Sequence, residues 1–191
     1  MVPRVVLPML AVVVLLAAAC THKGTSDKVT VESKPYVAAL VRDLVGHGVG
    51  DIEVSGTQAR CLAPRWVNVL QPTRLEAAGI EPSALAADAG MDAKAAKVPL
   101  TDAEIGKLVD AFGDCDMDLK AAYIDHATAG ATLSDDDRSC LTDALSDDLI
   151  RRITTVEVTK GAAAVDRDAT LSSDLFTALS ACPGAIALDG G

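Results

Sequence analysis

The feature that most constrains this fold is a set of four widely separated cysteines, Cys61, Cys115, Cys140 and Cys182. A fifth, Cys20, directly follows a short apolar leader. Four cysteines in an exported chain can pair in three ways. They show no CxxC or CxH spacing, and cysteines separated by dozens of residues are a poor zinc signature. We therefore interpret the four as a disulfide framework and expect no metal site and no cofactor.

The leader has the pattern of a secretory signal peptide at residues 1–19. Arg4 supplies the positive start, an apolar stretch of about a dozen residues follows, and Ala17-Ala18-Ala19 offers a small-residue cleavage site. A membrane-spanning helix needs about 20 apolar residues, so cleavage is the better interpretation.

Two peptidases fit the cleavage site. The sequence from Leu16 to Cys20 resembles a bacterial lipobox, although Ala17 stands where the usual lipobox has Leu. A polar tether at 20–34 follows, which suits a lipid anchor on Cys20 at the extracytoplasmic face of the cell membrane. The alternative is ordinary signal peptidase cleavage and a secreted protein with an odd thiol.

Charge excludes one class of partner. With the leader removed, 16 basic side chains oppose 27 acidic ones, a net charge of about −11. Nucleic-acid binding requires a basic surface, so we expect no nucleic-acid partner. Anionic lipid would also repel this chain, so membrane contact should come from the anchor.

The chain contains two related halves, at about 54–115 and 133–182. In each half, a Ser lies six positions before the first cysteine, and a large apolar residue lies five positions after it. The residues before the second cysteine have the same spacing of apolar positions in both halves. The matching positions are Ser55 and Ser134, Cys61 and Cys140, Trp66 and Leu145, Leu108 and Leu175, Phe112 and Leu179, and Cys115 and Cys182.

This repeat predicts the disulfide pairing. Each half has a cysteine near the start of one helix and a second near the end of another. In an antiparallel hairpin these two ends are neighbours. We therefore expect Cys61 to pair with Cys115, and Cys140 with Cys182.

Helix signals complete an all-α fold of two disulfide-stapled hairpins and an N-terminal helix, within 35–183, with a flexible tail at 184–191. An amphipathic stripe begins at Pro35 and ends at Gly46 and Gly48. Another helix is expected at 116–128. Start signals are expected at Ser55-x-x-Gln58, Thr73-x-x-Glu76, Thr101-x-x-Glu104 and Leu171-Ser172.

Three segments remain open. Pro64 lies inside the first cysteine helix and should kink or end it. Residues 153–159 are β-branched and fit either a strand or a helix that begins near Ser146. Residues 86–97 have the composition of a mobile connection.

Candidate chemistry is sparse. Asp114, Asp116 and Asp118 have the spacing that begins a calcium loop, with Asp125 at the twelfth position, but Leu119 stands where the loop needs Gly. We interpret Asp116 and Asp118 as favourable charges at the start of the next helix. The same explanation covers the acidic residues after Ser134 and Ser146.

The three histidines also give little evidence of a catalytic site. His22 is in the tether, His47 lies between glycines, and His126 is next to Asp125, which predicts a solvated pair. Trp66 is the only tryptophan, and its repeat position predicts a core residue. We predict that the protein is not an enzyme. Only a cleft that gathers His47 or His126 with a carboxylate and a hydroxyl would change that.

The pattern LS-x-x-x-x-x-C-L, followed by a run ending A-hydrophobic-x-x-C, resembles small actinobacterial secreted or lipid-anchored proteins with a cysteine-bracketed helical repeat. The resemblance covers roughly 35–183 and implies fold and location, with structural roles for Ser55, Ser134 and the four cysteines. It implies no activity, because such proteins are largely uncharacterised.

We therefore predict a lipid-anchored extracytoplasmic protein of unknown molecular role, either an interaction protein with a partner in the cell envelope or an envelope-maintenance protein. The alternative is a carrier that binds a small apolar ligand between helical hairpins. An enclosed cavity lined by Leu, Val and Phe would favour the carrier, and a solid core with one exposed apolar patch would favour a protein partner.

Intact mass of the membrane-extracted protein tests the anchor and the pairing together. We expect a diacylglycerol adduct on Cys20, and the loss of four hydrogens from two disulfides elsewhere. Peptide mapping without reduction should then link the predicted pairs. An unmodified Cys20, or a bond between Cys61 and Cys140, would contradict these expectations.

Overall fold

The computed structural model describes residues 29–50, 52–85, 97–128 and 133–186. The predicted signal peptide, Cys20, most of the predicted tether, most of the predicted connection at 86–97 and the end of the predicted tail lie outside them. Within the described ranges the regular structure is helical, with one isolated bridge between Val49 and Ile52, so the predicted all-α class is confirmed. No helix in these ranges is long and apolar enough to cross a membrane.

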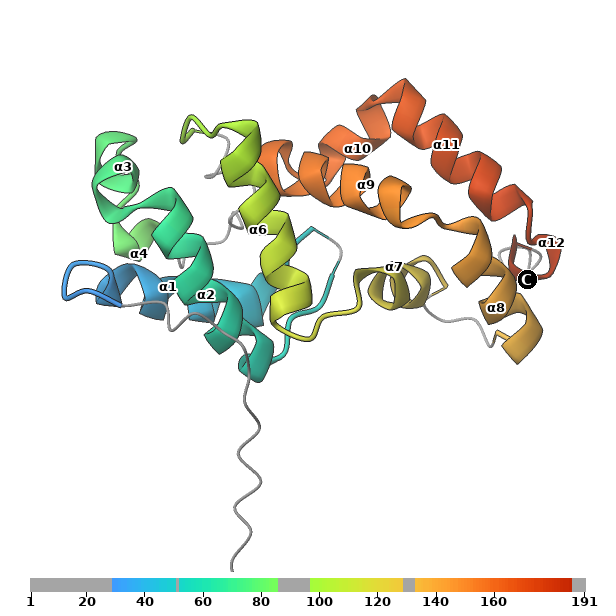
Figure 1. Ribbon diagram of the computed structural model, residues 1–191, viewed down its shortest axis with the longest axis horizontal. Helices are drawn as coiled ribbons and strands as arrows, with labels where there is room; N and C mark the ends of the chain where they lie inside the picture. The colour runs from blue at the N-terminus through green and yellow to red at the C-terminus, as the bar shows by residue number, and fades with distance from the viewer. Residues whose placement is uncertain (1–28, 51, 86–96, 129–132, 187–191) are drawn as a thin grey trace, which may run out of the picture.

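The first half is a bundle around α2. Its helices are α1 (Lys34–His47), α2 (Gly56–Leu70), α3 (Pro72–Ala77), α4 (Pro82–Leu85) and α6 (Asp102–Asp114). Figure 1 shows α1, α2, α3 and α4 together at one end of the molecule, with α6 beside α2. α1 packs against α2 and α4, and α2 packs against α6.

The second half is built on α9. Its helices are α7 (Leu119–Ala127), α8 (Asp135–Ala144), α9 (Asp147–Lys160), α10 (Ala163–Arg167), α11 (Ala169–Ser180) and α12 (Pro183–Ile186). α11 packs against α8, α9 and α10. Contacts between α6 and α9 join the halves at the middle of the long axis (Figure 1).

The buried apolar side chains form two clusters, one centred on each half. In the first cluster, Trp66 and Phe112 are the largest fully buried side chains. Val158 of α9 also belongs to this first cluster. Leu119 and Tyr123 of α7 pack against both clusters, so this short helix is shared between the two cores.

The two disulfides have the predicted pairing. Cys61 of α2 is bonded to Cys115 at the end of α6, with a Cα–Cα distance of 5.7 Å. Cys140 of α8 is bonded to Cys182 beyond the end of α11, with a Cα–Cα distance of 5.8 Å. The prediction of two disulfide-stapled hairpin modules is therefore confirmed.

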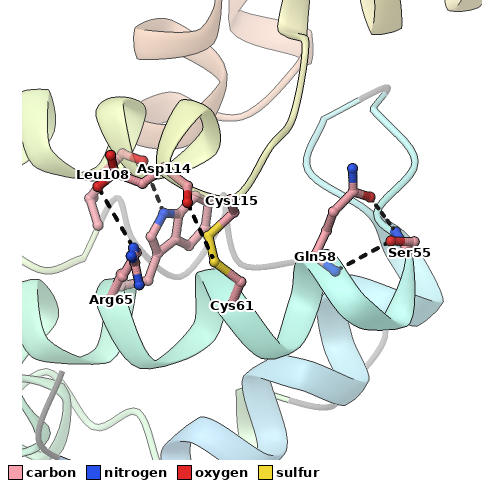
Figure 2. Close-up of a disulfide and its surroundings, with 8 residues drawn as sticks. Ser55, Gln58, Cys61, Arg65, Leu108, Asp114 and Cys115 are labelled. Atoms are coloured by element: carbon pink, nitrogen blue, oxygen red, sulfur yellow. Dashed lines mark hydrogen bonds and ion pairs between the residues drawn. A yellow bond between two sulfur atoms is a disulfide. The ribbon is translucent and has the colours of Figure 1, made fainter. Parts of the chain in front are cut away.

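Side-chain caps define the starts of several helices. The hydroxyl of Ser55 accepts from the Gln58 amide at 3.3 Å, while the Ser55 amide donates to Gln58 Oε1 at 2.9 Å. Figure 2 shows this capping box at the start of α2, with the disulfide further along the same helix. Thr101 and Glu104 form the second predicted box, and Ser134 and Ser146 cap α8 and α9.

Two predicted start signals are wrong. Thr73 does not cap α3, because the fixed φ of Pro72 suits the first helical position and the helix begins there. Ser172 lies inside α11, because Asp168 Oδ1 accepts from the amides of Thr170 and Leu171, both at 3.1 Å, and begins the helix earlier.

Two open segments are resolved as helix. α2 continues through Pro64 to Leu70, so the expected helix end at Pro64 is wrong. An interior proline costs roughly 3 kcal/mol, which burial of Trp66, Val67 and Leu70 beyond it offsets. Residues 153–159 belong to α9, whose apolar stripe on the second core outweighs their β-branched preference.

The matched cross-links predict matched losses of stability. The bridges span 54 and 42 residues, for which the loop-entropy model gives each roughly 4 kcal/mol. Cys61→Ser with Cys115→Ser, and Cys140→Ser with Cys182→Ser, should therefore lower the free energy of unfolding by similar amounts in urea titrations. Loss of stability from only one pair would contradict this expectation.

Candidate functional site

The aspartates with calcium-loop spacing have separate structural roles. Asp118 caps α7, its Oδ1 accepting from the Ala121 amide at 3.0 Å, as predicted. The backbone of Asp116 ends α6 with a φ of 55°, where the Met117 amide donates to Phe112 O at 3.0 Å. The predicted role of its carboxylate at the start of α7 stays a prediction. Asp125 forms an ion pair with Arg138 at 2.8 Å, a partner that the sequence did not suggest.

Metal ligands are not gathered in the part of the chain that the structure describes, where no group of three or more His, Cys, Asp and Glu side chains is placed to hold an ion. His22 lies outside that part. His47 Nδ1 lies 3.2 Å from Asp43 Oδ1, and the Asp43 side chain is buried. His126 is exposed on α7.

A polar hollow of about 450 Å³ lies between α2 and α6, and four of its five charged lining residues form ion pairs with other described residues, Lys107 being the exception. Arg65 lies 3.7 Å from Asp114 (Figure 2), and Asp110 is 2.7 Å from Arg151. Glu104 accepts from Thr101 and Arg74, and these hydrogen bonds, first that from the Thr101 amide, lower its pKa to about 2. We interpret this hollow as a surface ion-pair network.

An apolar pocket of about 370 Å³ lies in the second half, enclosed by α7, α9, α10 and α11. Leucine, isoleucine, valine and alanine make up most of its wall. Four polar side chains join them: Tyr123, His126, Glu157 and Asp166. The apolar lining residues are Ala127, Leu145, Ile150, Ile153, Ala162, Ala163, Val165, Leu175 and Leu179.

The polar wall of this pocket is organised around Glu157. Its side chain lies on α9, where the residue is only 3% exposed. The Tyr123 hydroxyl donates to Glu157 Oε2 and also lies 3.4 Å from Thr154 Oγ1. Thr154 is fully buried and donates to Ile150 O at 2.9 Å. Hydrogen bonds of this kind let a buried carboxylate remain inside an apolar core.

A turn of the first half packs against the same carboxylate. Gly50 has a φ of 56°, and a Cβ atom there would lie 2.9 Å from Glu157 Cδ. Only glycine fits this position, because the backbone is left-handed and the carboxylate is in the way. Glu157 therefore lines the apolar pocket and also lies against the first half.

Sequence reasoning missed Glu157 and the pocket. The available signal was the helical spacing of Ile150, Ile153, Thr154, Glu157 and Val158, which puts a charged residue on an apolar stripe. Leu145, Leu175 and Leu179 were recognised as repeat positions, but nothing local indicated a space between them. His126 was recognised, without its place at the pocket.

The pocket meets the stated condition for reconsidering an enzyme, since His126 lines it with the Glu157 carboxylate and the Tyr123 hydroxyl. Ser, Thr, Cys and Lys are not among its lining residues, but carboxylate, imidazole and phenol groups, which can also act as nucleophiles, are. The arrangement offers an apolar volume with a polar edge, which suits binding.

No protein-family model matches the chain, and neither the curated proteins nor the solved structures gave a significant match. The resemblance to actinobacterial envelope proteins therefore stays a prediction.

Two glycines with left-handed backbone test the Gly50 contact. Gly79 has a φ of 70° and no atom within 4 Å of its Cβ position, so Gly79→Ala should cost only backbone strain. Gly50→Ala should destabilise by about 1–3 kcal/mol more, since it displaces a buried hydrogen-bonded carboxylate. Urea unfolding measures both. Equal losses would show that the contact contributes nothing.

Proposed function

We propose that this protein is an extracytoplasmic, membrane-tethered binding protein that holds a small apolar molecule in the pocket of its second half. The pocket itself carries the proposal. Its volume of about 370 Å³ lies in the usual range for ligand sites, roughly 300–1,000 Å³. An apolar wall with a few polar groups at one side is also typical of such sites.

Location supports the same proposal. Two disulfides indicate an oxidising, extracytoplasmic compartment. A lipid on Cys20 would hold the chain at the membrane surface, where apolar molecules concentrate. The tether would keep the acidic protein face away from anionic lipid.

The exposed apolar side chains favour a ligand over a protein partner. Among the described residues, the large ones are Val29, Val31 and Val45, at 39%, 74% and 52%, and Phe176, at 72%. The valines lie on or just before α1 and Phe176 on α11, helices that lie in different halves of the molecule (Figure 1). They therefore make no single patch, and isolated exposed apolar residues are common.

Catalysis in the same pocket is the second candidate, because His126, Tyr123 and Glu157 line it together. These groups suit proton transfer. A bound molecule recovered chemically unchanged after prolonged incubation supports binding, and a converted one supports catalysis.

Binding is tested with the exported chain carrying Cys20→Ser and the neutral fluorescent probe N-phenyl-1-naphthylamine. We expect saturable binding that Ala163→Trp reduces at least tenfold, because Ala163 is exposed and lines the pocket. The matched control Ala103→Trp, exposed on α6, should bind like the parent. Absence of saturable binding, or equal binding by both variants, would overturn the proposal.

A further inference from the structure

We infer that the ligand of this pocket is a small planar aromatic molecule, whose ring takes the place that Trp66 and Phe112 fill in the first half. The inference rests on the proposed binding function and adds the chemical class of the ligand. Its basis is a comparison of the two hairpins, which have matching disulfides and matching register but carry aromatic residues in one and leucines in the other.

The frames match at the cross-links. The bonded cysteines have Cα–Cα distances of 5.7 Å in the first half and 5.8 Å in the second. In each, the sulfur of the first cysteine lies near the carbonyl oxygen of the residue before its partner. These distances are 3.9 Å from Cys61 to Asp114 (Figure 2) and 3.7 Å from Cys140 to Ala181.

The register also matches beyond the cysteines. Leu62 and Leu141 directly follow them and are both buried, at 0% and 1% exposed. Five positions after each cysteine stand Trp66 and Leu145. Leu145 lies at the end of α8, but its amide still donates to Leu141 O at 2.9 Å. This hydrogen bond places Leu145 one turn beyond Leu141, as Trp66 follows Leu62 in α2, although the ψ of 96° at Leu145 ends α8 there while α2 continues to Leu70.

Aromatic rings fill the inside of the first hairpin. Trp66 Nε1 donates to the carbonyl oxygen of Leu108 at 3.0 Å, so the indole reaches from α2 to α6. The indole meets the Phe112 ring edge to face, with centroids 5.6 Å apart and planes at 85°. Both residues are at most 1% exposed.

Leucines replace both rings in the second hairpin. The counterparts of Trp66, Leu108 and Phe112 are Leu145, Leu175 and Leu179, and all three line the pocket. A leucine occupies less space than an indole or a phenyl ring, and such a replacement leaves a cavity unless the surroundings collapse. The disulfide from Cys140 of α8 to Cys182, beyond the end of α11, fixes the position of these two chain ends relative to each other.

We expect the pocket of the second half to accept a planar ring. In the first half, the space between α2 and α6 holds the Trp66 ring edge-on to the Phe112 ring. In the second half Tyr123 lines the pocket and offers an aromatic face or edge to a bound ring. An aliphatic chain would fill the same volume without those contacts.

Indole and 1-hexanol are the test probes, measured by calorimetry on the exported chain with Cys20→Ser. We expect indole to bind saturably and at least tenfold more tightly than 1-hexanol. Leu145→Trp should place an indole in the pocket, as Trp66 does in the first half. This should abolish indole binding and, because the cavity is filled, raise the midpoint of urea unfolding. Leu179→Phe is a second filling variant, expected to weaken indole binding. The matched control Leu100→Trp changes a leucine outside the pocket and should leave binding unchanged.

The outcomes separate the two proposals. If neither probe nor N-phenyl-1-naphthylamine binds, the binding function itself fails. If 1-hexanol binds and indole does not, the ring assignment fails and the binding function stands. Indole binding that survives both filling variants in folded protein would place the ring elsewhere and overturn the inference.

Discussion

Each disulfide ties the start of one helix to the end of another, and the rest of the structure depends on this constraint. The Cα–Cα separations of 5.7 and 5.8 Å fix the open ends of two hairpins at nearly the same spacing. Side chains inside each hairpin then decide whether the space is filled. Trp66 and Phe112 fill it in the first half, whereas leucines in the second leave an apolar pocket.

Much of this fold could be predicted because its signals are local or repeated. The hydroxyl of Ser55 and the carboxylate of Glu104 act within three residues, so their capping boxes are visible in the sequence. The pairing of cysteines followed from the repeat, since a hairpin brings its outer ends together. The buried position of Trp66 followed from the same register.

Other features depend on contacts that no local pattern encodes. Pro64 remains helical because the residues beyond it are buried, and that burial belongs to the tertiary structure. The Glu157 carboxylate is held by Tyr123, 34 residues away, and packs against Gly50. The pocket needs α7 and α10 as walls, and their positions depend on packing between elements. The sequence therefore predicted the modules but not the space inside one of them.

α7 packs against both hydrophobic cores, so stabilisation of the pocket would reach the first half as well. Leu119 and Tyr123 contribute to both cores, and Glu157 meets a turn of the first half. Neither core can open without removing part of the wall of the other. A molecule that bound only the folded pocket would stabilise that folded state by an amount set by its concentration relative to its Kd. That stabilisation would also extend to α1 and α2, which line no part of the pocket.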